Sequence, residues 1–373
     1  IAAKGEGFDF KNGNAALTGH INSMGYNGYQ YSNVDVKGSL NRGLYDVHLN
    51  SKDPNARLNL VASGVYNETK PTVKVKGSVF KLDLYKLGFY NEPMIIAGNL
   101  DGDFSNLDPD ALNGHLYLTN FALSNTKDVF PMQEVILEAV STADQNSLIL
   151  KSQVADVDLV GKYKLTQIFG ALASTINQYY QFQKPSAVAK ITPGQYFTLN
   201  AQIKNDDLIR RFVPDLKSFE TITLNGNFNA DSRQLEVHGQ IPQLTYGSNV
   251  IDNAVLDISN SAEALQYQLS AGSLKSESFA LNKINAQGDI ADNVIRYDVT
   301  TKDAKDIPQF LVAGQAKSLN DITEISLNPN GLKLNYDDWQ VGEGNKIQLS
   351  SKGIWADNFK LSNNGSEILL QSE

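Results

Sequence analysis

A seven-residue pattern, apolar-x-apolar-x-Gly-x-apolar, recurs along most of the chain. In one copy Val34, Val36 and Leu40 alternate with polar side chains, and Gly38 takes the remaining position on the apolar face. Alternation with a period of two predicts a strand with one face in a core and the other in water. Similar copies occupy 60–66, 73–79, 98–104, 157–163, 222–228, 235–241, 284–290, 310–316 and, more weakly, 349–355.

The spacing of these glycines predicts how the strands are connected. Gly64 and Gly77 are 13 residues apart, and Gly38 and Gly64 are 26 apart. One strand and its turn therefore take about thirteen residues, as in a meandering antiparallel sheet. The chain would supply about two dozen strands, more than the roughly ten that a twisted open sheet usually holds. Because glycine lets crowded strands kink, we expect a mainly β protein whose long antiparallel sheet curls into an elongated trough, apolar inside and polar outside.

Other architectures can absorb many one-sided strands. Serial β-sandwiches need linkers between domains, and the sequence has one convincing linker, Gln183–Gly194. A membrane barrel would gather aromatic residues into girdles, whereas Tyr and Phe are scattered here. The apolar face could also pack as a closed, dry sandwich core, which is the commoner case among β proteins. The number of strands favours an open groove.

One stretch interrupts the strand repeat with apolar residues at helical spacing. These are Leu165, Ile168, Phe169, Leu172 and Ile176. No charged residue occurs from 165 to 183, which is unusual for a helix in water, yet the stretch is too polar to cross a bilayer. We expect an amphipathic helix that lies against the mouth or interior of the trough and plugs the groove. The chain would then consist of an N-terminal part of the sheet at 1–163, the helix at 164–183 and a C-terminal part of the sheet at 184–373.

Composition excludes several classes of function. The chain has no cysteine, which excludes disulfides, thiolate metal sites and a Cys nucleophile. The formal net charge of −9 argues against nucleic acid as a partner and against adsorption to an anionic membrane surface. No apolar run approaches the length of about 18 residues that a membrane-spanning helix needs. Because the chain starts at Ile1 without a signal-like segment, we expect it to be a processed or excised piece.

No motif with catalytic or metal-binding chemistry emerges. Asn99–Leu112 has the carboxylates of a calcium loop, but Asn106 stands where the loop needs Gly and Leu112 where it needs Glu. The histidines are far apart and lie on or beside polar faces, where a solvated surface role is expected. They are His20, His48, His115 and His238. We therefore expect no enzyme activity, no cofactor and no metal.

The strand repeat and two short stretches resemble the TamB/AsmA-like envelope proteins, especially forms from Bacteroidota. The stretches are LVGKYKLTQ at 159–167, which leads into the uncharged helix, and RRFVPDLKSF at 210–219. Over most of the chain the resemblance consists of the repeated one-sided strand pattern, and it is more specific in the two stretches. It implies a periplasmic β-taco, anchored in the inner membrane by a segment outside this one and reaching toward a BamA-type (TamA-like) outer-membrane barrel.

The function that the resemblance implies is a non-enzymatic bridge that carries phospholipid between the inner and outer membranes and supports outer-membrane biogenesis. An apolar groove would remove most of the cost of about 0.8 kcal/mol for each acyl CH₂ exposed to water. The groove would be lined by the apolar face of the repeat: Val34, Val36, Leu60, Val73, Val75, Leu100, Phe104, Val157, Leu159, Phe197, Leu199, Leu224, Phe228, Leu235, Val237, Ile241 and Ile284.

Two other functions stay open. One is a scaffold or chaperone for outer-membrane protein assembly, within a translocation and assembly module with the BamA-type barrel. The other is an adhesin or passenger domain of repeated β-sandwiches.

Overall fold

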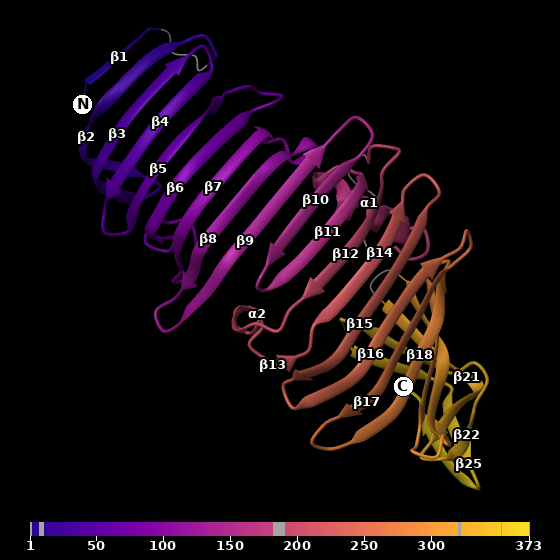
Figure 1. Ribbon diagram of the computed structural model, residues 1–373. Coiled ribbons are helices and arrows are strands. Elements are labelled where there is room, and N and C mark those ends of the chain that lie inside the picture. The colour runs from indigo at the N-terminus through magenta and orange to yellow at the C-terminus, as the bar shows by residue number, and fades with distance from the viewer. Residues whose placement is uncertain (1, 7–10, 182–190, 320–321, 352, 373) are drawn as a thin grey trace. The chain divides into compact units, whose positions relative to one another are not determined.

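The computed structural model describes residues 2–6, 11–181, 191–319, 322–351 and 353–372 (Figure 1). These residues are predominantly β, with 26 strands, two short α-helices and two 3₁₀ turns. The chain divides into two compact units, the first formed by Ile1–Thr166 with Asp206–Leu208, and the second by Gln167–Asn205 with Ile209–Glu373. The predicted linker at Gln183–Gly194 lies in unit 2, and its residues 183–190 are outside the described residues.

Unit 1 is an antiparallel meander in which each strand pairs with the next one in the chain. Its strands are β1 (Ala2–Glu6), β2 (Asn14–Tyr26), β3 (Tyr29–Asn41), β4 (Leu44–Lys52), β5 (Ala56–Val65), β6 (Thr72–Asp83), β7 (Ile95–Asn106), β8 (Asn113–Ser124), β9 (Val129–Ser141), β10 (Asn146–Ser152) and β11 (Ala155–Lys162). The 3₁₀ turn η1 (Pro109–Ala111) lies between β7 and β8.

Unit 2 continues the same style of meander after a helical segment. That segment consists of the 3₁₀ turn η2 (Leu165–Gln167), which begins in unit 1, and α1 (Ile168–Ile176). The remaining elements are β12 (Tyr196–Ile203), α2 (Asp207–Phe212), β13 (Leu216–Phe219), β14 (Ile222–Asn229), β15 (Gln234–Tyr246), β16 (Asn249–Asn260), β17 (Leu265–Lys275), β18 (Ala280–Ala291), β19 (Val294–Lys302), β20 (Pro308–Leu319), β21 (Ile322–Leu334), β22 (Asp337–Val341), β23 (Lys346–Ser350), β24 (Gly353–Asp357), β25 (Phe359–Asn363) and β26 (Ser366–Leu370).

The last strands of unit 2 branch. The end of β21 pairs with β22, whereas its start pairs with β23. A small core forms around this branch from Leu332, Val341 and Leu361, with Trp339 and Phe359 packed against it. These three residues are among the buried apolar side chains of unit 2.

Tight turns explain why consecutive strands pair. At the β2–β3 turn Asn27 and Gly28 have φ of 48° and 75°, and at the β3–β4 turn Arg42 and Gly43 have φ of 47° and 85°. Two successive residues with positive φ form the hairpin turn whose twist matches that of the strands it joins. A two-residue turn leaves the next strand no position except beside its predecessor.

The expected antiparallel sheet is confirmed, but its expected curl is wrong. Figure 1 shows the strands of unit 1 side by side in chain order, and the sheet is not strongly curled. Left-handed φ values occur at single residues inside strands, such as Asn33, Asn120 and Asn253. Asparagine tolerates this conformation better than most residues. These interruptions distort single strands locally and do not bend the whole sheet.

Asp53 is a buried carboxylate that fixes the β4–β5 turn of unit 1. It is 0% exposed. Its Oδ1 accepts hydrogen bonds from the Tyr29 hydroxyl (2.9 Å) and from the backbone N–H of Asn55 (2.8 Å) and Ala56 (3.0 Å). Its Oδ2 accepts from the N–H and hydroxyl of Ser32, at 2.8 and 3.1 Å. Burial alone would raise the pKa of this carboxyl, but the hydrogen bonds outweigh burial and the pKa is lowered.

We expect Asp53→Asn to destabilise unit 1 by about 2–3 kcal/mol, because an amide nitrogen facing N–H donors leaves buried groups without partners. Urea unfolding at pH 7 measures this, with the exposed Asp128→Asn as the control, expected within about 0.5 kcal/mol of wild type. Since the pKa of Asp53 is lower when folded, its stabilisation is present above the unfolded value of 3.8 and is lost as pH falls through the folded value. A wild-type advantage that persists undiminished at pH 2 would contradict this assignment.

Candidate functional site

The pairing register of unit 1 gathers the apolar positions of the repeat onto one face of the sheet. Leu60 lies opposite Leu49 on one side and Gly77 on the other. Gly77 in turn lies opposite Leu100, which lies opposite Leu118. Directly paired residues in a sheet share a face. This row therefore crosses five neighbouring strands with apolar or glycine residues throughout.

All nine predicted lining residues of unit 1 lie on this apolar face. Further rows run parallel to the first, such as Val75 opposite Gly102 and Val73 opposite Phe104, and Leu159 lies opposite Leu148. The nine are Val34, Val36, Leu60, Val73, Val75, Leu100, Phe104, Val157 and Leu159.

Unit 2 has an equivalent apolar face, built on β12 and β14 to β20. Phe197 lies opposite Phe228, with ring centroids 5.1 Å apart, and Phe228 lies opposite Leu235. In the neighbouring row Leu199 lies opposite Gly226, and Gly226 lies opposite Val237. The eight predicted residues on this face are Phe197, Leu199, Leu224, Phe228, Leu235, Val237, Ile241 and Ile284.

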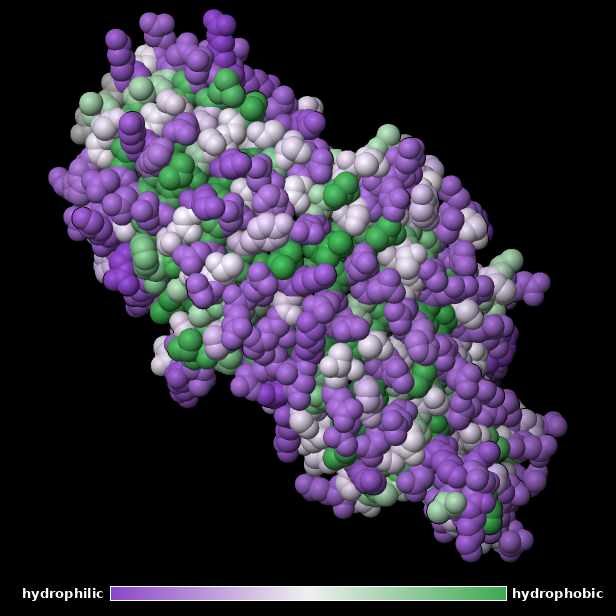
Figure 2. Space-filling model, in the orientation of Figure 1, coloured by the Kyte–Doolittle hydropathy of each residue, from purple (hydrophilic) through white to green (hydrophobic). Residues whose placement is uncertain are grey.

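The apolar faces are partly covered and partly exposed to solvent. The chain exposes 22208 Å², whereas two separate compact bodies of half its mass would expose roughly 18,000 Å² in total. Most of the predicted lining residues are only partly buried, and Leu224 is exposed. Figure 2 shows apolar residues reaching the surface between polar ones. Among the described residues, water therefore reaches part of each apolar face, although Phe104, Phe228 and Leu235 are buried.

Three glycines of the repeat are covered by tyrosines from the preceding strand, an arrangement that we call the tyrosine–glycine pair. The pairs are Tyr45–Gly64, Tyr267–Gly288 and Tyr297–Gly314. In each pair the two residues lie directly opposite one another on adjacent strands. In the first two the hydroxyl reaches past the glycine to the strand beyond. The Tyr45 hydroxyl donates to the Thr72 carbonyl (2.9 Å), and the Tyr267 hydroxyl donates to the Arg296 carbonyl (3.0 Å). Burial raises the pKa of all three hydroxyls.

These pairs change the interpretation of the glycine repeat. We predicted glycine as a device for curvature, but at these positions it makes room for a carbonyl of the next strand and for the tyrosine hydroxyl. A Cβ on Gly288 would collide with the Arg296 carbonyl oxygen and lie 2.8 Å from the Tyr267 hydroxyl. The sequence repeat could not reveal this role, because the covering tyrosine lies about twenty residues away and is identified only by register.

We expect Gly288→Ala to destabilise unit 2 by about 2–3 kcal/mol, since the methyl group must displace backbone and ring together. Gly226→Ala is the matched control on the same face, where a Cβ would be 3.5 Å from the Glu236 carbonyl oxygen, an ordinary contact. The control should change stability by less than about 1 kcal/mol. Thermal unfolding of both variants measures the difference, and equal melting temperatures would refute this role of Gly288.

The predicted helix is present but shorter, with η2 and α1 together covering 165–176. Ala171, Thr175 and Tyr179 form its buried side. The Tyr179 hydroxyl donates to the Ser261 carbonyl (2.6 Å), and the backbone N–H of Asn293 donates to the Tyr179 carbonyl (2.9 Å). These bonds attach the end of the helical segment to the ends of strands β16 to β19 in unit 2.

The predicted packing of Phe169 is wrong. Its side chain is 85% exposed, whereas Ile168, Leu172 and Ile176 are partly buried. The buried residues of α1 are instead the small Ala171 and Thr175. The spacing of large apolar residues therefore identified the helix but placed Phe169 on the wrong side.

We expect Phe169→Asp to change stability by less than about 0.5 kcal/mol, because the side chain is already in water. Ala171→Asp on the same helix should cost about 2 kcal/mol or more, since it buries a carboxylate without a partner. Circular dichroism during urea unfolding compares the two. The reverse order of effects would show that the helix packs through Phe169 as first predicted.

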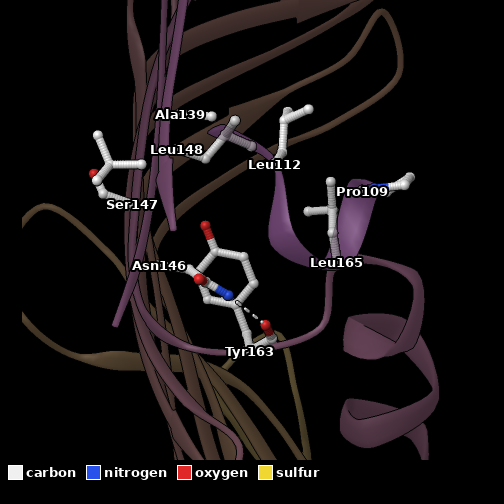
Figure 3. Close-up of a pocket in the computed structure, with 9 residues that line it drawn as sticks. Pro109, Leu112, Ala139, Asn146, Ser147, Leu148, Tyr163 and Leu165 are labelled. Atoms are coloured by element: carbon white, nitrogen blue, oxygen red, sulfur yellow. Dashed lines mark hydrogen bonds between the residues drawn. The ribbon is translucent and has the colours of Figure 1, made fainter. Parts of the chain in front are cut away.

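A small hollow lies at the end of the apolar face in unit 1 (Figure 3). Leu112, Leu148 and Leu165 line it together with Tyr163, whose carbonyl accepts a hydrogen bond from Asn146 Nδ2 (2.8 Å). Burial raises the pKa of Tyr163 to about 12. The hollow has a volume of about 10 Å³, which is enough for at most one water molecule. We therefore assign it to packing around η2, and not to ligand binding.

The opposite face of the sheet in unit 1 carries paired charges. Lys74 lies 2.9 Å from Asp103, and Lys76 lies 2.6 Å from Asp101, so both carboxylates of the candidate calcium loop are engaged by lysines. Hydrogen bonding to Lys76 lowers the pKa of Asp101. Within the described residues no group of acidic or histidine side chains is arranged to hold a metal ion.

The histidines lie on the same polar side. His20 and His238 each face an aspartate on the neighbouring strand, and His115 stacks on Tyr117 with ring centroids 4.5 Å apart. His48 is 3.4 Å from Asp46. Three of the four are exposed, and His115 is partly exposed.

Comparisons with protein-family models, with curated proteins and with solved structures found no match. Among the described residues, no helix has the length and apolar character needed to cross a membrane.

Proposed function

We propose that this chain is a non-enzymatic phospholipid carrier whose apolar sheet faces hold acyl chains during passage between the inner and outer membranes. The observation that carries the proposal is the continuous apolar face, assembled in each unit from residues of many strands and left partly exposed to solvent. Monomeric proteins rarely leave contiguous apolar surface of this kind in water without a partner or ligand for it.

The chemistry of the face suits an acyl chain better than a specific small molecule. Neighbouring strands are about 4.8 Å apart, so a row across ten strands offers an apolar track of roughly 45 Å. Each CH₂ moved from water onto such a surface gains up to about 0.8 kcal/mol. Polar groups that would fix a ligand in one orientation are scarce on this face, as expected when the cargo must move along it.

The open face modifies the trough that the sequence suggested. An acyl chain on a weakly curled sheet keeps one side in water, so binding is weaker than in a closed groove. Weak binding favours transfer, because a carrier must also release its cargo. In this proposal α1 packs through its buried Ala171 and Thr175 and leaves Phe169 in solvent, so it does not plug the face.

The setting of the proposal is the periplasm, with a BamA-type outer-membrane barrel as the receiving partner. The resemblance to TamB/AsmA-like proteins supports this placement, together with the absence of cysteine from the sequence.

Site-specific photo-crosslinking in cells tests the proposal. We expect a photoreactive residue at Leu60, Val75 or Val237 to capture phospholipid, because each side chain lies on an apolar face. The matched controls are the adjacent residues Asn59, Lys76 and Glu236, which lie on the opposite face of the same strands. Lipid captured equally from both sets, or from neither, would overturn the proposal.

One observation favours a second function, the assembly of outer-membrane proteins. Strand β26 pairs with β25 along one edge, and all five residues of SEILL are exposed. An exposed strand with three consecutive apolar residues can accept a further strand by β-augmentation. Protein crosslinks concentrated at β26, with no lipid at the apolar faces, would favour this function over lipid carriage.

A further inference from the structure

Three cations lie in a row on neighbouring strands of unit 1. Lys52 on β4 is directly opposite Arg57 on β5, and Arg57 is directly opposite Lys81 on β6. Like charges opposite one another destabilise a sheet. Elsewhere on the same sheet cross-strand lysines face aspartates, as Lys74 faces Asp103.

Within the described residues no carboxylate forms an ion pair with any member of this row. The Lys81 amine donates instead to the Pro54 carbonyl (2.9 Å) and to Asn55 Oδ1 (3.1 Å). The Arg57 guanidinium lies 5.8 Å from the centre of the Phe80 ring. Lys52 and Arg57 remain exposed. Acceptors in the 54–55 turn hold Lys81, but no carboxylate offsets the repulsion between Lys52 and Arg57, so an anion from outside the chain would lower it.

The loop that follows the row is rigidly built. Between β6 and β7 the backbone N–H of Leu87 donates to the Asp83 carbonyl (3.0 Å), and that of Phe89 donates to the Leu84 carbonyl (2.9 Å). Leu87 is 0% exposed and anchors the loop. The side-chain amide of Asn27, in the β2–β3 turn, donates to the carbonyl oxygens of Leu87 and Gly88 at 3.1 and 3.0 Å. The two connections are therefore held together.

This rigid loop presents aromatic rings to water. Phe89 is 54% exposed, and Tyr85 and Tyr90 are also exposed. The Lys86 amine lies 5.8 Å from the centre of the Tyr85 ring. Tyr26 projects from the neighbouring turn at 62% exposure. We refer to Lys52, Arg57, Phe80, Lys81 and residues 85–90 as the basic-aromatic corner.

The corner differs in charge from the rest of the chain. Its acidic neighbours are Asp53, which is buried and accepts five hydrogen bonds, Asp83, which accepts from the Lys86 N–H (3.0 Å), and Glu92. The four cations outnumber them, although the whole chain has a net charge of −9. The argument from net charge against an anionic membrane therefore does not apply locally.

We propose that the basic-aromatic corner docks unit 1 onto the surface of a bilayer that contains anionic phospholipid. Tyrosine rings with a polar tip and an apolar body favour the interface between headgroups and acyl chains. Exposed cations beside them contact headgroup phosphates, and each contributes about fivefold in partitioning. The corner would hold the protein beside the membrane, and it does not depend on whether the apolar faces carry lipid.

Vesicle co-sedimentation of the full chain tests this proposal, using phosphatidylcholine alone and phosphatidylcholine mixed with phosphatidylglycerol. The corner variant combines Lys52→Gln, Arg57→Gln and Lys86→Gln. Lys81 is kept because its amine holds the 54–55 turn. The charge-matched control combines three exposed lysines elsewhere: Lys151→Gln, Lys217→Gln and Lys346→Gln.

We expect wild type and the control to bind the anionic vesicles and the corner variant to lose roughly one hundredfold in partitioning. Phe89→Ser with Tyr90→Ser should weaken binding to both kinds of vesicle. Equal binding by the corner variant and the control would overturn the proposal. Release of the wild-type protein by millimolar inorganic phosphate at constant ionic strength would also overturn it, because that result would indicate a site for free phosphate.

Two further readouts keep the outcomes separate. Matching circular dichroism and melting temperatures show that the corner variant is folded. Lipid crosslinking from Leu60 and Val75 reports on the apolar face, so that membrane docking and lipid carriage can each fail alone.

Discussion

The structure depends on cross-strand register. Each apolar row is determined by the residues that lie opposite one another on paired antiparallel strands. A shift of one residue in the register of any strand would move its apolar side chains to the polar face. Two-residue turns such as Asn27-Gly28 set that register for some pairs of strands, such as β2 and β3. Hairpin geometry therefore has more influence on the apolar faces than any single hydrophobic contact, because few side chains in the described sheets are fully buried.

A sheet whose apolar face is only partly covered must also gain stability in other ways. The tyrosine–glycine pairs do this within the sheet. A ring laid over a glycine buries its own apolar surface and the neighbouring backbone, and its hydroxyl bonds a carbonyl one strand further on. One tyrosine side chain therefore links three strands. The residue opposite it is a glycine, so no second bulky side chain projects from the face at that point. Asp53 also stabilises several groups through one side chain, because its carboxylate accepts hydrogen bonds from the backbone of the β4–β5 turn.

Much of this fold could be predicted from the sequence, and the parts that could not share a cause. Alternation of period two identified the strands and the apolar side of each, so all seventeen predicted lining residues lie on the expected faces. The curl was wrong because the glycines were interpreted without their partners, which only register reveals. Phe169 was misplaced because helical spacing marks large apolar residues, whereas the buried residues of α1 are Ala171 and Thr175. Asp53 and the row of Lys52, Arg57 and Lys81 carry no local signal, since their meaning depends on strands far apart in sequence.

The pairing of each strand with its chain neighbour has a further consequence. In unit 1 stability is a sum of contributions from adjacent strands, as in repeat proteins. Two strands could be inserted or removed at a turn without altering the chain direction or the side on which any other residue lies. The length of the apolar face is then set by the number of hairpins. Duplication or loss of a segment of about 26 residues would therefore lengthen or shorten the apolar face of unit 1 with no redesign of its core.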